Sequence, residues 1–438
     1  SRASILNTIE FAKEIKAVQK GGAKIEVSYA SNEEETVSFI WEKIHQHVQG
    51  GTSEEDILNN EIIKNSHVPG LKVGKTGLEK SFEDKLIGTN GVQRYEVNAY
   101  GKRINQIDHE EGTQGEKIEL TLDTEVQKLS HELLKDLAGS ISVMDIYTGE
   151  IIAMQSSPSF DPNLFLFGIS QDDWQLIRNN PLKPLVNKTL TGLYSPGSTI
   201  KPIVALSALE NKIINKNFRV NCTGKIEMYG QTYHCWKKKG HGVVDLRNAM
   251  KQSCDTYFYE IARKLGVDRL KKTAVKFGLG EKVLNETFNN EKRGLIPDTQ
   301  WKKNNLGKGW VIGETLITGI GQGYMQTTPL QLCLMTAQLA NGGHKIYPKI
   351  TVEKNDETFE DIKSLIEKKH NEHMQIRNGL VESGGGLLSF GKDKRYENLY
   401  QNFENIEIVR EAMFASTNEV RGTSYSSRIK DPKYQFAG

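Results

Sequence analysis

A serine and a lysine three positions apart are the first residues of this chain whose types and spacing suggest chemistry. They lie in Tyr194-Ser-Pro-Gly-Ser198-Thr-Ile-Lys201-Pro202, where a Pro-Gly turn precedes an apolar helical run over 203–209. We therefore expect Ser198 at a helix N-terminus, with Lys201 on the same helical face. A desolvated lysine can activate a serine nucleophile, and free N–H groups at a helix start favour an oxyanion. The pattern predicts acyl transfer, although an isolated Ser-x-x-Lys pair is more often a helix cap beside a solvated lysine.

A second pair of polar side chains, Ser253 and Asp255, lies within a predicted helical stretch over 246–265. Residues two apart can face one cleft together from a loop between helices. Ser253 would then relay a proton, and Asp255 would orient Lys201 or the substrate. Taken alone, a Ser-x-Asp triplet says little about function.

A third group consists of sulfur and imidazole ligands. Cys222, Cys235, His241 and Cys254 lie close together in the sequence. Three thiolates and one imidazole form the ligand set of a closed, tetrahedral zinc site, so we predict a structural zinc ion here. Two other interpretations stay open, a Cys222–Cys235 disulfide and a set of buried free thiols. His234 is an alternative imidazole ligand.

The position of Cys254 indicates what a metal ion bound by this group would stabilise. It stands between Ser253 and Asp255. If those two side chains face a cleft, Cys254 faces away from it, and the ion would brace the loop from behind. The fourth cysteine, Cys333, lies in an apolar helical run over 330–339 and is expected in the core.

Composition excludes several classes of protein. The chain has 438 residues, with 57 Lys plus Arg against 55 Asp plus Glu, so a formal net charge of +2 gives no reason to expect a nucleic-acid partner. No apolar run approaches the roughly 20 residues that span a bilayer. The first residue is Ser1 and not Met, so a signal or anchor segment could have been removed.

Hydrophobic patterning divides the chain into two regions. Residues 1–138 mix predicted helices with short strands, namely helices over 5–19, 37–47 and 124–137 and strands over 24–29, 93–98 and 116–122. From residue 139 onward the pattern predicts a strand-turn-strand hairpin and then long helices, an α+β arrangement. The hairpin covers 141–145 and 150–155, the helices cover 199–210, 246–265 and 329–341, and a charged insertion is expected over 353–410.

Together, these motifs resemble the penicillin-binding transpeptidases. Ser198-x-x-Lys201 and Ser253-x-Asp255 match two motifs of that family. The closest likeness is to its class B, monofunctional, elongation-specific branch. Further matches follow the family's order over roughly 70–425: Gly74-Lys-Thr-Gly-Leu-Glu79, Thr121-Leu-Asp123, Ser157-Pro-Ser-Phe-Asp-Pro-Asn163, Cys235-Trp-Lys-Lys238, Gly240-His-Gly242, Thr318-Gly-Ile-Gly-Gln-Gly-Tyr324 and Thr328-Pro-Leu-Gln331.

The resemblance implies an α+β fold and a specific reaction. A serine β-lactamase-like transpeptidase domain over 139–438, an antiparallel sheet with helices, would follow an elongated, non-catalytic, dimerisation-type pedestal of mixed α/β structure over 1–138. The activity would be that of a D,D-transpeptidase that cross-links peptidoglycan stem peptides during cell elongation and is the target of β-lactams. Ser198 would be the nucleophile, Lys201 the general base and Ser253 the proton relay. Catalysis would need no cofactor.

The same resemblance implies a place in the cell and partners. The protein would be anchored in the bacterial inner membrane and face the periplasm. It would work on the cell wall with a membrane-embedded glycan polymerase and shape-determining proteins.

One motif departs from the family pattern. The family's third motif is a Lys-Thr-Gly strand after the nucleophile, whereas the Lys-Thr-Gly of this chain is at 75–77, in the pedestal match. We interpret 75–77 as having no catalytic role. Residues 434–438 resemble the approach to the third motif, so we expect that motif to follow residue 438. The alternatives are a serine β-lactamase, an acylable β-lactam sensor and a non-catalytic cell-wall scaffold.

Overall fold

The structure is a computed structural model that describes most of the chain after residue 76, together with three short strands before it. The expected helices over 5–19 and 37–47 lie outside the described residues. These residues are 26–28, 49–51, 72–74, 76–97, 102–135, 137–165, 168–284, 287–352, 364, 368, 397–431 and 434–438.

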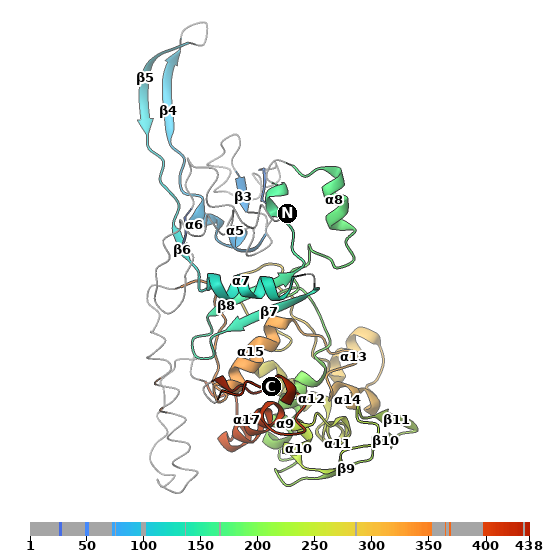
Figure 1. Ribbon diagram of the computed structural model, residues 1–438. Coiled ribbons are helices and arrows are strands. Elements are labelled where there is room, and N and C mark those ends of the chain that lie inside the picture. Colours follow the sequence, from blue (N-terminus) through green and yellow to red (C-terminus); the bar gives the residue numbers. More distant parts are fainter. Residues whose placement is uncertain are drawn as a thin grey trace.

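The N-terminal region forms an elongated projection above a larger helical body (Figure 1). Its longest feature is an antiparallel hairpin of β4 (Val92–Val97) and β5 (Arg103–Glu110), and β5 is exposed along nearly its whole length. Two further antiparallel pairs join strands distant in sequence, β1 (Glu26–Ser28) with β6 (Lys117–Glu119) and β2 (Gln49–Gly51) with β3 (Lys72–Gly74).

The base of the projection shares a hydrophobic core with the body. Two short helices, α5 (Gly77–Ser81) and α6 (Glu83–Leu86), bury Leu78 and Leu86 almost completely. Because apolar area removed from water contributes about 25 cal/mol per Å², this shared cluster ties the two regions together. Its other members include Leu120, Met144, Ile151, Phe288, Leu334 and Ile350.

The expected hairpin at the start of the body is confirmed. It consists of β7 (Gly139–Met144) and β8 (Ile151–Ser157), and the side chain of Asp145 closes its turn by accepting backbone N–H bonds. The helix α7 (Thr124–Leu133) lies along β8 (Figure 1). It is shorter than the expected 124–137 and begins after Asp123, whose carboxylate accepts from the first free N–H groups.

The larger core surrounds one apolar helix, α9 (Lys201–Glu210). Its residues from Ile203 to Ala208 are fully buried. A helix whose side chains are apolar on every side offers no polar face to water, so other elements must enclose it. The other helices of the body are α10 (Leu246–Lys251), α11 (Asp255–Leu265), α12 (Val267–Lys276), α13 (Thr299–Leu306), α14 (Ile312–Thr318), α15 (Pro329–Ala340) and α17 (Phe403–Asn418), whereas α8 (Gln171–Arg178) lies above the body, at the height of β3 (Figure 1).

Two expectations for the body need correction. The stretch 246–265 is not one helix, because the chain breaks at residues 252–254 between α10 and α11. The predicted boundary of the charged insertion, residue 410, lies too far along the chain. Residues from 403 onward belong to α17, where Phe403, Ile406 and Val409 are buried. Their apolar spacing is that of a core helix, but the many charged neighbours mask it.

None of the helices that the structure describes combines the length and the apolar character needed to cross a bilayer.

The central position of α9 generates a stability prediction. Leu206 is fully buried in the larger core, so Leu206→Ala should lower the free energy of unfolding by roughly 2–5 kcal/mol through lost burial and a residual cavity. Urea denaturation of the two proteins measures this difference. Leu176→Ala on α8, where the side chain is 72% exposed, is the matched control and should change stability little. Equal losses in both variants would contradict the central role of α9.

Candidate active site

Ser198 lies in a tight turn directly before α9. The turn is the 3₁₀ helix η2 (Gly197–Ile200), and the Ser198 side chain is exposed. A glycine-rich segment that follows α14 fixes the position of this turn, because Gly197 N–H donates to the Gly321 carbonyl at 2.9 Å. A Cβ atom at Gly321 would lie 2.1 Å from the Gly197 carbonyl oxygen. Only glycine allows the two backbones to approach this closely.

Lys201, one turn further, is 3% exposed and has three acceptors. Its Nζ donates to Asp255 Oδ1 at 2.7 Å, to Ser253 Oγ at 2.9 Å and to the Ser253 carbonyl at 3.0 Å. The ammonium also lies 5.2 Å from the ring centroid of Phe258. A buried ammonium with all three protons donated avoids most of the cost of leaving water.

The two hydroxyls and the ammonium form a continuous hydrogen-bonded chain. Ser253 Oγ donates to Ser198 Oγ at 3.1 Å, and the same oxygen accepts from Lys201. Ser253 therefore connects the lysine to the exposed serine. This arrangement can carry a proton between Ser198 and Lys201 in either direction, depending on which group holds it.

The break between α10 and α11 is what places Ser253 there. Ser253 has a φ of 50°, in the left-handed region that non-glycine residues seldom adopt. Cys254 then caps α11, and Asp255 is the first residue of that helix. A continuous helix, as the apolar pattern predicted, would turn Ser253 and Asp255 away from each other.

A cleft of about 780 Å³ opens over Ser198. Of the predicted catalytic residues, Ser198, Ser253 and Asp255 line it, whereas Lys201 lies beneath. Trp236 also lines the cleft, as do Gln322 and Arg421, to which the sequence analysis assigned no role. The remaining lining residues are His234, Cys235, Tyr259, Ile320, Gly422 and Thr423.

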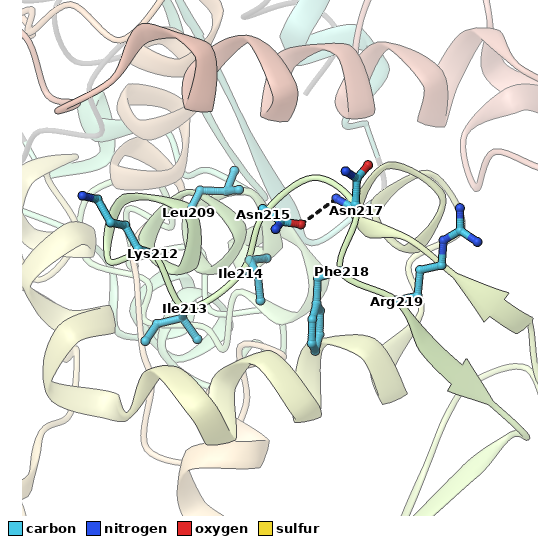
Figure 2. Close-up of a pocket in the computed structure, with 8 residues that line it drawn as sticks. All are labelled: Leu209, Lys212, Ile213, Ile214, Asn215, Asn217, Phe218 and Arg219. Atoms are coloured by element: carbon cyan, nitrogen blue, oxygen red, sulfur yellow. Dashed lines mark hydrogen bonds between the residues drawn. The ribbon is translucent and has the colours of Figure 1, made fainter.

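A second hollow, of about 700 Å³, lies away from Ser198 at the end of α9 (Figure 2). Leu209, Ile214 and Phe218 contribute apolar side chains, and Lys212 and Arg219 lie toward its two ends. The eight lining residues include no serine, cysteine, histidine or carboxylate. We therefore assign the chemistry to the cleft over Ser198.

The three cysteines and the imidazole meet directly behind the Ser253 loop. Their ligand atoms lie within 4.8 Å of one another, and all three cysteines are free and buried. His241 Nδ1 is 3.5 Å from Cys222 Sγ and 3.6 Å from Cys235 Sγ. His234, the alternative ligand, lies instead on the cleft. Cys254 is fully buried, as expected for a residue facing away from the cleft.

Short strands bring these ligands together. Cys222 ends β9 (Val220–Cys222), which pairs antiparallel with β12 (Gly242–Val244) next to His241. Cys235 follows the hairpin of β10 (Lys225–Met228) and β11 (Gln231–His234). A hydrogen bond between the Cys235 and Cys254 thiols lowers the pKa of Cys235 and raises that of Cys254. Cys333 lies apart, packed half-buried against the smaller core as expected.

An ion-pair cluster at the end of α17 anchors the segment 421–423, which lines the cleft. Glu419, at the end of α17, pairs with Arg247 and, at 2.8 Å, with Lys251 of α10. The next residues run along the cleft, and Thr423 N–H donates to the Lys251 carbonyl at 3.1 Å. Hydrogen bonds from Arg247 and Lys251 lower the pKa of Glu419 to about 2.

Comparisons with known proteins identify the family. A family model for the penicillin binding protein transpeptidase domain matches residues 139–438. The chain belongs to the penicillin-binding protein transpeptidase family. A second model, the penicillin-binding protein dimerisation domain, matches residues 40–120. Both the family and the α+β fold class predicted from the motifs are confirmed.

Individual relatives point to one branch of the penicillin-binding proteins. The chain is 38% identical to a peptidoglycan D,D-transpeptidase MrdA of Acinetobacter baumannii over 280 residues, 64% of this chain and 42% of that protein. It is also 38% identical to the Escherichia coli K12 protein of the same name over 288 residues, 65% of this chain and 45% of that protein. The chain thus spans less than half the length of these curated relatives.

Solved structures of penicillin-binding protein 2 share the fold. One is a complex with MreC from Helicobacter pylori, with a TM-score of 0.72 and 30% identity, covering 88% of this chain and 65% of that one. Another is the Pseudomonas aeruginosa protein in complex with WCK 5153, with a TM-score of 0.69 and 32% identity, covering 86% of this chain and 73% of that one. Both agree with the branch predicted from the sequence.

The Glu419 cluster predicts a specific loss of stability in acid. Because the folded pKa of about 2 lies below the ordinary 4.5, the stabilisation is present above pH 4.5 and is lost as the pH falls toward 2. The group is partly exposed, so solvent screening limits the effect to about 1 kcal/mol. The melting temperature of the parent protein should therefore fall more between pH 7 and pH 3 than that of Glu419→Gln.

The matched control for this prediction is Glu404→Gln on the same helix. Glu404 pairs with Lys216 at 3.4 Å, and both side chains are well exposed. This variant should keep the acid sensitivity of the parent. Identical pH dependence in the parent and in Glu419→Gln would contradict the assignment.

Proposed function

We propose that this chain carries the acyl-transfer site of a peptidoglycan D,D-transpeptidase that acts in cell elongation and is acylated by β-lactams. The observation that carries the proposal is the chain from buried Lys201 through Ser253 to exposed Ser198. Family membership and the names of the relatives support the substrate class. Ser198, Lys201, Ser253 and Asp255 are the proposed catalytic set.

The proposed reaction has two halves. Ser198 Oγ attacks the carbonyl carbon of the penultimate D-Ala, and its proton passes through Ser253 to Lys201, which must enter this step as the free amine. The C–Oγ bond forms, the C–N bond breaks, and the terminal D-Ala leaves with a proton returned through Ser253. An amine of a neighbouring stem peptide then attacks the acyl carbonyl carbon: the new C–N bond forms, the C–Oγ bond breaks, and the proton lost by the amine passes through Lys201 and Ser253 to Ser198 Oγ.

The charge of Lys201 changes during both halves. Asp255 Oδ1, at 2.7 Å, stabilises the ammonium that forms when Lys201 accepts the Ser198 proton. The same Nζ contacts Ser253 Oγ at 2.9 Å, so the amine that takes up the Ser198 proton stands where it can return it through the same hydroxyl.

We further propose the division of the chain and its place in the cell. Residues 1–138 would be the non-catalytic pedestal and residues 139–438 the transpeptidase domain, in agreement with the two family matches. The protein would act at the periplasmic face of the inner membrane with a glycan polymerase. The Helicobacter pylori complex with MreC supports shape-determining proteins as partners.

Finally, we propose a structural zinc ion on Cys222, Cys235, His241 and Cys254. In a tetrahedral site with Zn–S of about 2.3 Å and Zn–N of about 2.0–2.1 Å, an N···S edge is roughly 3.6 Å long. The two edges from His241 Nδ1, at 3.5 and 3.6 Å, fit this value. With four protein ligands the ion would have no open position, so it would take no part in the reaction.

The nucleophile is tested by covalent labelling of the full-length protein. Ser198→Ala should abolish the adduct seen by intact mass after incubation with benzylpenicillin, because it removes the proposed nucleophilic oxygen. Ser426→Ala, at an exposed serine of η4 (Tyr425–Ser427), should label like the parent. Persistent labelling of Ser198→Ala would refute the assignment. Steady release of D-Ala from a donor peptide would separate a transpeptidase from a sensor that acylates once.

The zinc proposal is tested by metal content. Protein purified without chelator should contain about one zinc per chain by elemental analysis, since four ligands close one site. Cys254→Ser should lose most of the metal, whereas Cys333→Ser should retain it. Metal near zero in the parent protein, with an intact Cys222–Cys235 bridge found by peptide mapping, would favour the disulfide.

A further inference from the structure

Trp236 makes contacts that packing does not explain. Its side chain is 59% exposed and lines the cleft over Ser198, so little apolar area is buried by placing it there. Its indole Nε1–H donates to the carbonyls of Gln252 and Ser253, each at 3.0 Å. Its backbone N–H donates to Asp255 Oδ2 at 2.9 Å. All three bonds reach the loop between α10 and α11.

Two of these acceptors belong to residues that also hold Lys201. The Ser253 carbonyl accepts from Lys201 Nζ at 3.0 Å as well as from the indole. Asp255 binds Lys201 through Oδ1 and Trp236 through Oδ2. Trp236 therefore fixes two groups whose positions determine where the lysine and the Ser253 hydroxyl lie.

The backbone of Ser253 needs such support. A non-glycine residue at a φ of 50° costs on the order of 1 kcal/mol or more, and it persists where its surroundings hold it. Backbone bonds from Ser253 N–H to Met250 and from Cys254 N–H to Ala249 fix the amide side of this turn. The indole holds the carbonyl side, and the edge-on contact of its ring with His241, at 5.5 Å between centroids, sets the ring orientation.

We propose that Trp236 is a positioning residue for acyl transfer. Its indole N–H holds the Ser253 carbonyl, and this keeps the Ser253 hydroxyl between Lys201 and Ser198. The inference rests on the proposed function only in taking Ser198 as the nucleophile. It assigns to the indole N–H a role that the aromatic ring surface alone cannot fulfil.

The test separates the N–H group from the ring. In the full-length protein, Trp236 is replaced by Phe and, through site-specific incorporation, by 3-benzothienylalanine, in which sulfur takes the place of the indole N–H. Stopped-flow acylation by the chromogenic cephalosporin nitrocefin gives the limiting first-order rate constant and the half-saturating concentration. Both replacements should lower the rate constant about three- to tenfold, the range expected for losing one solvent-exposed hydrogen bond at a strained turn. The half-saturating concentration should change less than threefold.

Several outcomes would overturn the inference. If the ring serves only as a wall for the ligand, the benzothienyl protein will acylate at the parent rate, and Phe will raise the half-saturating concentration alone. Because the benzothienyl side chain keeps the shape of tryptophan, it remains decisive if Trp236→Phe fails to fold. Failure of the parent protein to label at Ser198 would instead refute the proposed function.

Trp310→Phe is the matched control. Trp310 is also a partly exposed tryptophan whose indole donates a hydrogen bond, to Thr315 Oγ1 at 2.8 Å, and it does not line the cleft. This variant loses an equivalent bond on α14 and should acylate with both parent constants. A rate loss equal to that of Trp236→Phe would mean that the effect is a general loss of structure.

Discussion

The buried amino group of Lys201 is the constraint on which the rest of the site depends. A nitrogen that carries a positive charge during part of the cycle cannot leave water without losing several kcal/mol unless its protons find acceptors. Three acceptors meet it, and all three come from Ser253 and Asp255. The loop that carries these two residues must therefore hold its position to within the tolerance of a hydrogen bond.

This requirement accounts for the unusual structure around the loop. The helical stretch breaks after α10, Ser253 adopts a left-handed backbone, and Cys254 turns into the protein behind it. On the cleft side, Trp236 bonds to the same loop. On the buried side, the sulfur and imidazole cluster packs against it. The loop is thus supported from both faces, and a relay residue on such a loop needs no motion to meet its partners.

Ser198, the proposed nucleophile, is held in a different way. Ser198 stands on a turn that is anchored by the close backbone approach of Gly197 and Gly321, at the start of a helix buried on every side. Rigid placement of the two hydroxyls and the lysine suits a reaction in which a proton must move along them twice. The N-terminal region joins this body through a shared core, so the two regions do not behave as independent units at their junction.

The sequence alone was sufficient for the elements with strong local patterns. The hairpin of β7 and β8 follows from alternating apolar residues around a turn, and α9 and α15 follow from continuous apolar runs. The choice of Ser198 and Lys201 also needed only local sequence, namely their spacing of three residues together with the flanking Pro-Gly turn and Pro202. The family resemblance came from several such local motifs in order.

Only the tertiary structure decided how separate motifs meet. The apolar pattern over 246–265 predicts one helix, because helical propensity is local, whereas the break at Ser253 is stabilised by contacts with Lys201 and Trp236, which lie far away in the sequence. The choice of His241 over His234 as the partner of the sulfurs was likewise set by the pairing of β9 with β12. Residue types and spacing determine what a segment can do chemically; long-range packing determines which segments come within hydrogen-bonding distance.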